Sequence, residues 1–71
     1  MSWSVTDELA VTKRHLAVAE RQQAAQITHI KILTDGGLST AAAEHVLREI
    51  EATLATLRAR RFNLEAAQRH P

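Results

Sequence analysis

The sequence predicts an all-α protein: an antiparallel helical hairpin that dimerises into a four-helix bundle. Three observations support this fold class. The two glycines, Gly36 and Gly37, are adjacent near the middle of the chain, and the one proline is its last residue. Apolar residues recur at alternating spacings of three and four residues on both sides of the glycine pair, which is the spacing of helices packed side by side. The chain is also short, with 71 residues and 3% aromatic residues.

The small size predicts that the hairpin has a partner. A domain of this length buries a modest share of its surface and usually depends on disulfides, a metal or another chain for stability. The sequence contains no cysteine, which excludes disulfides and thiolate metal sites. A second copy of the chain is therefore the expected source of additional core.

The two helices are expected at residues 5–34 and 40–68, joined by a turn at 35–39, within a single domain covering 1–71. Ser4 and Asp7 have the spacing of a capping box at the first helix start. The glycine pair is suited to the left-handed conformation that ends helices, and Ser39 or Thr40 can cap the second helix. Because the connection is short, the helices should pack antiparallel, with facing residue numbers that add up to about 73.

The core is expected along one row of each helix. In the second helix the row is regular, and in the first it is interrupted by Gln23, which stands where an apolar residue would continue the pattern. Either Gln23 is a buried polar residue that fixes the register, or the helix is rotated so that Ile27 points inward and Gln23 lies at the rim. We favour the rotated helix, and the expected core residues are Leu9, Leu16, Ile27, Ile30, Leu47, Ile50, Leu54 and Leu57.

A second apolar row on the first helix predicts a subunit interface. Val11, Val18 and Ile32 share a heptad position that lies well around the helix from the Leu9 row. One neighbouring helix cannot cover both rows, and exposed apolar patches usually indicate association. We therefore expect a non-enzymatic, homodimeric protein-interaction or regulatory module, which could also contact another protein.

The alternative function is a small nucleic-acid-binding regulator. The antiparallel pairing of residues across the hairpin brings a group of basic residues to its open end, where they could contact phosphates. The net charge of +1 gives no general reason to expect nucleic-acid binding. This possible anion or nucleic-acid patch contains Lys13, Arg14, Arg58, Arg60 and Arg61.

No motif indicates catalysis, a cofactor or a membrane segment. Two helices offer a seam rather than a closed pocket, so we expect neither enzymatic activity nor cofactor binding. A metal site using His29 and His45 near the turn is a weaker hypothesis, because no two histidines have the i, i+4 spacing that places two imidazoles on one metal ion. With no signal peptide or membrane span in the sequence, the expected location is the cytoplasm.

The sequence also resembles a group of short alphaproteobacterial two-helix proteins. The resemblance rests on Ala19-Glu20-Arg21, Leu33, Asp35-Gly36, Thr40-Ala41, Val46-Leu47, Glu51, Leu54 and Leu57. It implies a helical hairpin and no particular activity. Gln22 replaces the histidine that follows the arginine in those proteins, so a histidine-based function is not implied here.

Overall fold

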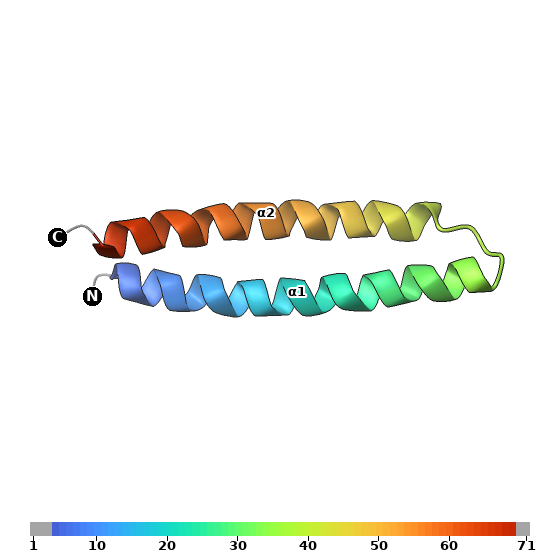
Figure 1. Cartoon of the computed structure of the whole chain (residues 1–71), viewed down its shortest axis with the longest axis horizontal. Helices are drawn as coiled ribbons and strands as arrows, with labels where there is room; N and C mark the ends of the chain where they lie inside the picture. The colour runs from blue at the N-terminus through green and yellow to red at the C-terminus, as the bar shows by residue number, and fades with distance from the viewer. Residues whose placement is uncertain (1–3, 70–71) are drawn as a thin grey trace.

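The computed structural model describes residues 4–69, which form two long antiparallel helices. α1 spans Val5–Asp35 and α2 spans Ala41–Arg69. They lie side by side along their whole length, with both chain ends at the same end of the molecule (Figure 1). The hairpin is elongated, with extents of 55 × 17 × 17 Å. The predicted all-α hairpin is confirmed, and the helix limits differ from the predicted ones by one residue at three of the four ends.

α1 begins with the predicted capping box. The Asp7 backbone N–H donates to Ser4 Oγ at 3.1 Å, and the Ser4 N–H donates to Asp7 Oδ2 at 3.4 Å. These bonds satisfy backbone donors that have no partner within the helix. The acidic side chains of Asp7 and Glu8 also lie in the first turn, where the helix dipole favours negative charge.

The turn ends α1 with a Schellman motif. The Leu38 N–H donates to the Leu33 carbonyl at 2.9 Å, and the Gly37 N–H donates to the Thr34 carbonyl at 3.0 Å. Gly37 has a φ of 69°. This left-handed conformation is sterically unfavourable for a residue with a Cβ atom. The chain then reverses, and the Ala41 N–H donates to Ser39 Oγ at 3.4 Å as α2 begins.

The two helices meet along a seam of buried and half-buried residues with regular three- and four-residue spacing. Its centre is the most closely packed part, where Leu16, Ala19 and Leu54 form a buried cluster flanked by Ile50 and Leu57. Leu54 is fully buried and Leu16 is 3% exposed. The α1 side of the seam consists of Leu9, Thr12, Leu16, Ala19, Gln23, Gln26, Ile30 and Leu33, and the α2 side includes Thr40, Ala43, Leu47, Ile50, Leu54, Leu57 and Leu64.

The prediction that Ile27 belongs to the core is wrong. Its side chain is 51% exposed, whereas Gln23 and Gln26 are half-buried on the seam. Gln23 Nε2 donates to Glu51 Oε2 at 3.4 Å, and Gln26 Nε2 donates to the Ala43 carbonyl at 2.8 Å. Both amides thus find partners on α2, and α1 keeps the rotation that places Leu9 and Leu16 against α2. The other expected core residues are buried or half-buried.

Within residues 4–69, neither helix combines the length and the apolar composition that crossing a membrane requires.

Candidate functional site

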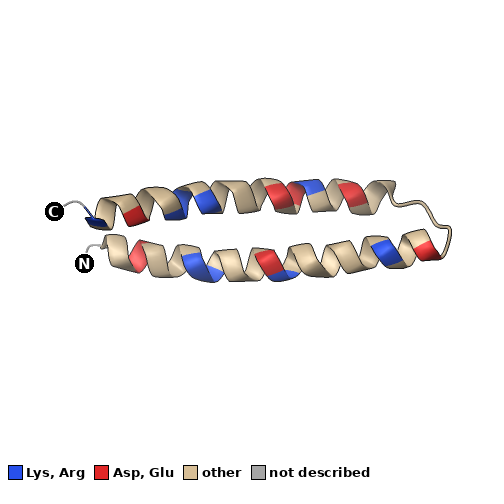
Figure 2. Cartoon of the chain, in the orientation of Figure 1, with Lys and Arg blue, Asp and Glu red and all other residues tan. Residues whose placement is uncertain are grey.

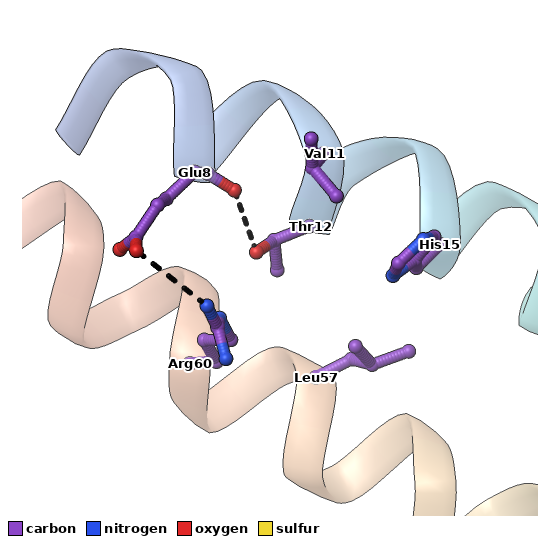
Figure 3. A pocket seen from close by; sticks show the side chains of 6 residues that line it. All are labelled: Glu8, Val11, Thr12, His15, Leu57 and Arg60. Carbon is purple, nitrogen blue, oxygen red and sulfur yellow. Dashed lines mark hydrogen bonds and ion pairs between the residues drawn. The ribbon is translucent and has the colours of Figure 1, made fainter. Parts of the chain in front are cut away.

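A shallow groove follows one side of the seam and draws on both helices. Its first hollow, of about 290 Å³, lies toward the open end of the hairpin and is lined by Glu8, Val11, Thr12, His15, Leu57 and Arg60 (Figure 3). Its second hollow, of about 280 Å³, is lined by His15, Val18, Ala19, Gln22, Thr53 and Leu57. His15 and Leu57 line both hollows, so the two form one continuous groove. We call this side of the hairpin the groove flank.

The opposite side of the seam has a different composition, and we call it the charged flank. Its residues directly follow seam residues that are spaced seven apart, from Thr12 to Gln26 in α1 and from Ala43 to Leu64 in α2, so heptad spacing places them together on the side away from the groove. They are Lys13, Glu20 and Ile27 of α1, and Glu44, Glu51, Arg58 and Glu65 of α2. In the groove lining, by contrast, only Glu8 and Arg60 carry a formal charge at neutral pH.

The two charges of the groove face each other at its outer end. Glu8 Oε1 lies 4.0 Å from Arg60 Nη2. This ion pair joins α1 to α2 and leaves the lining with no net formal charge. Figure 3 shows both side chains on the far side of Thr12 from His15. The remaining lining side chains offer apolar surface, small hydroxyls, one amide and one imidazole.

Thr12 is a buried residue that the sequence analysis missed. It is 2% exposed, and its hydroxyl donates to the Glu8 carbonyl at 2.8 Å, so its burial leaves no polar atom unpaired. Strict continuation of the three- and four-residue spacing from Leu9 would have identified both Thr12 and Gln26 as seam positions. The predicted core omits them because it contains apolar residues alone.

The predicted interface row lies on the groove flank. Val11 lines the first hollow and Val18 lines the second. Val18 is 44% exposed, and Ile32, nearer the turn, is 62% exposed. From α2, the 44% exposed Val46 directly precedes the seam residue Leu47, which places it on this flank as well. α2 therefore covers the Leu9 row of α1 and leaves much of the second row uncovered.

The five predicted anion-binding residues are not gathered on one face. Lys13 and Arg58 lie on the charged flank, whereas Arg60 lines the groove and pairs with Glu8. Arg61 Nε lies 3.9 Å from Glu65 Oε1. All five side chains, including that of Arg14, are exposed. Figure 2 shows acidic and basic residues interspersed along both helices rather than segregated. Nucleic-acid binding stays a prediction of the sequence, without an observation that favours it.

The described histidines include one that pairs with a carboxylate. His45 Nε2 lies 2.8 Å from Glu49 Oε1 one helical turn away, and both side chains are largely exposed. Within residues 4–69, no three or more histidine, aspartate or glutamate side chains lie close enough together to hold a metal ion. The geometry therefore adds no support to a site using His29 and His45.

Comparison of the chain with models of protein families, with curated proteins and with solved structures finds no match. Function is therefore inferred from the geometry of this chain alone.

Proposed function

We propose that the chain is a non-enzymatic protein-interaction module that works as a homodimer, with two hairpins packed into a four-helix bundle. The observation that carries this proposal is the uncovered apolar row of α1, in which Val18 and Ile32 keep 44% and 62% of their surface exposed. In a bundle, each helix contacts more than one neighbour, and a helix with two apolar rows satisfies this requirement.

The size of the hairpin supports a contact along its length. A face 55 Å long and 17 Å wide exceeds the ~800 Å² per partner that a typical stable interface buries. The hairpin alone has a thin core, since its closely packed cluster consists of Leu16, Ala19 and Leu54. A second hairpin would cover apolar surface that one hairpin leaves in water, and each buried methylene would contribute about 0.8 kcal/mol.

The charge of the groove supports a second copy as the partner. Because Glu8 and Arg60 balance each other, two groove linings can approach without net repulsion. On the charged flank, the four residues of α2 are the glutamates Glu44, Glu51 and Glu65 and one arginine, Arg58. Two copies meeting there would place like charges close together, which disfavours association. The groove flank is thus the better surface for self-association.

Matched substitutions on the two flanks test this function. We expect the unchanged protein at micromolar concentration to sediment with twice the 7.9 kDa mass of one chain. Val18→Glu should sediment as a monomer, because it places a charge in the interface. Ile27→Glu is the control, since Ile27 is a similarly exposed β-branched residue on the other flank, and it should stay dimeric.

Circular dichroism would establish that both variants remain helical. A well-folded monomer for the unchanged protein would overturn the proposed function. Equal sensitivity to both substitutions would show that the groove flank is not the contact surface.

A further inference from the structure

The groove lining contains one histidine, His15. It lines both hollows, so it occupies the middle of the groove rather than its edge. Figure 3 shows it beside Leu57 and Val11, on the side of Thr12 away from the ion pair. Histidine side chains in general gain or lose their charge between pH 5 and 8. A second hairpin packed on the groove covers His15 in whichever direction the hairpins run.

We propose that protonation of His15 controls self-association: the dimer forms with His15 neutral and weakens in mild acid. This inference rests on the proposed dimer and adds a regulatory role to the same surface. An imidazolium ion covered by a protein surface loses its hydration and needs a hydrogen-bonded anionic partner to compensate. The residues around His15 in its own hairpin do not provide such a partner, and the lining of a second copy would bring the same paired Glu8 and Arg60.

The charged and titratable groups that face the groove are few. From α1 the nearest is Glu8, two helical turns before His15, and its carboxylate lies by the Arg60 guanidinium. From α2 the group is Arg60 itself, which has the same sign as an imidazolium ion. The other residues that contact the groove near His15, including Leu57, Thr53 and Gln22, have no charge. Protonation would therefore add an uncompensated positive charge to a lining that is otherwise balanced.

The sign of the effect follows from proton counting. In the separate hairpins the His15 side chain is exposed. Exposed histidines in general take up a proton as the solution becomes mildly acidic. In the dimer it is covered and binds fewer protons. Acid therefore favours the separated state, and the contribution counts twice because each copy supplies one His15. Carboxylates in general titrate mainly below this pH window.

The test compares dimer dissociation constants from sedimentation equilibrium at pH 7.5 and pH 5.5, with circular dichroism at both pH values to show that the helices persist. We expect the dissociation constant of the unchanged protein to rise at least tenfold at pH 5.5. His15→Gln keeps a polar, uncharged side chain in the groove, and its dissociation constant should change little between the two pH values.

Another histidine provides a matched control. His45 pairs with Glu49 outside the groove lining. His45→Gln should therefore keep the response of the unchanged protein. An unchanged protein that is dimeric with equal affinity at both pH values overturns the histidine switch and leaves the dimer intact. A response that persists in His15→Gln also overturns the switch, whereas a folded monomer at pH 7.5 overturns the proposed function itself.

Discussion

The two flanks of the seam differ although the same pair of helices builds both. On the charged flank, six of the residues beside the seam carry a formal charge, and the one large apolar side chain is the exposed Ile27. On the groove flank, the lining is mostly apolar or uncharged, and its two charges pair with each other. Charged residues beside a seam favour exposure to water, whereas valines at heptad spacing form an apolar surface on which another helix can pack. A hairpin can thus be asymmetric in its interactions while its internal seam is regular.

The largest expected effect comes from the seam itself, on which both flanks depend. Leu54 is fully buried in the central cluster, so Leu54→Ala leaves a cavity that the helices can fill only partly. We expect a loss of about 2–5 kcal/mol in unfolding free energy, as for other buried leucines. For a small hairpin, this loss is enough to unfold much of the population at 25 °C. Thermal denaturation followed by circular dichroism measures the effect, and a loss below about 1 kcal/mol would contradict the central position of Leu54.

The next prediction separates an interface made by α1 alone from one that uses both helices. Val46→Lys adds a charge to the groove flank from α2, at a position that is 44% exposed. If α2 contributes to the interface, the dimer dissociation constant should rise at least tenfold, or by about 1.4 kcal/mol. Glu44→Lys, two residues earlier on the charged flank, is the control and should leave the dissociation constant unchanged. Sedimentation equilibrium at pH 7.5 would compare the two variants, and equal effects would remove the distinction between the flanks.

The smallest expected effect concerns the turn, which joins the helices but belongs to neither flank. Gly37→Ala should cost about 1–2 kcal/mol in unfolding free energy, because Gly37 has a φ of 69°. Gly36→Ala should cost less, since Gly36 has ordinary helical angles and an added Cβ would lie 3.5 Å from the nearest atom, the Ile32 carbonyl oxygen.

Urea unfolding would measure both glycine variants. At concentrations where each variant is folded, neither should change the dimer dissociation constant. A change in self-association in either variant would show that the turn takes part in the interface, and that stability and association are not separate properties of this hairpin.

Much of the fold could be predicted from the sequence because its determinants are local. Ser4 and Asp7 form the capping box that their spacing indicates, and the glycine pair ends α1 through bonds among residues within a few positions of each other. The pairing of residues across the hairpin is also determined locally, since a short turn fixes which residues of the two helices lie opposite each other. Gln23 and Glu51 are hydrogen-bonded, and their numbers add up to a value close to that predicted.

The groove was less predictable, because it depends on where one helix lies against the other. The sequence showed the second apolar row of α1, including Val11 and Val18. It did not show that Leu57, Thr53 and Arg60 from α2 complete the same surface. Nor did it show His15 between the two hollows, since an isolated histidine carries no periodic pattern.

Local sequence patterns suffice to predict two antiparallel helices, their ends to within one residue, and more apolar surface on α1 than one neighbour can cover. The rotation of α1 about its axis depends instead on how the two helices pack. Turning the helix to bury Ile27 would move the rest of the seam away from α2, whereas Gln23 and Gln26 can stay on the seam because their amides reach partners on α2. Rotation of a helix is set by the sum of contacts along its whole length, and a single favourable side chain does not outweigh that sum.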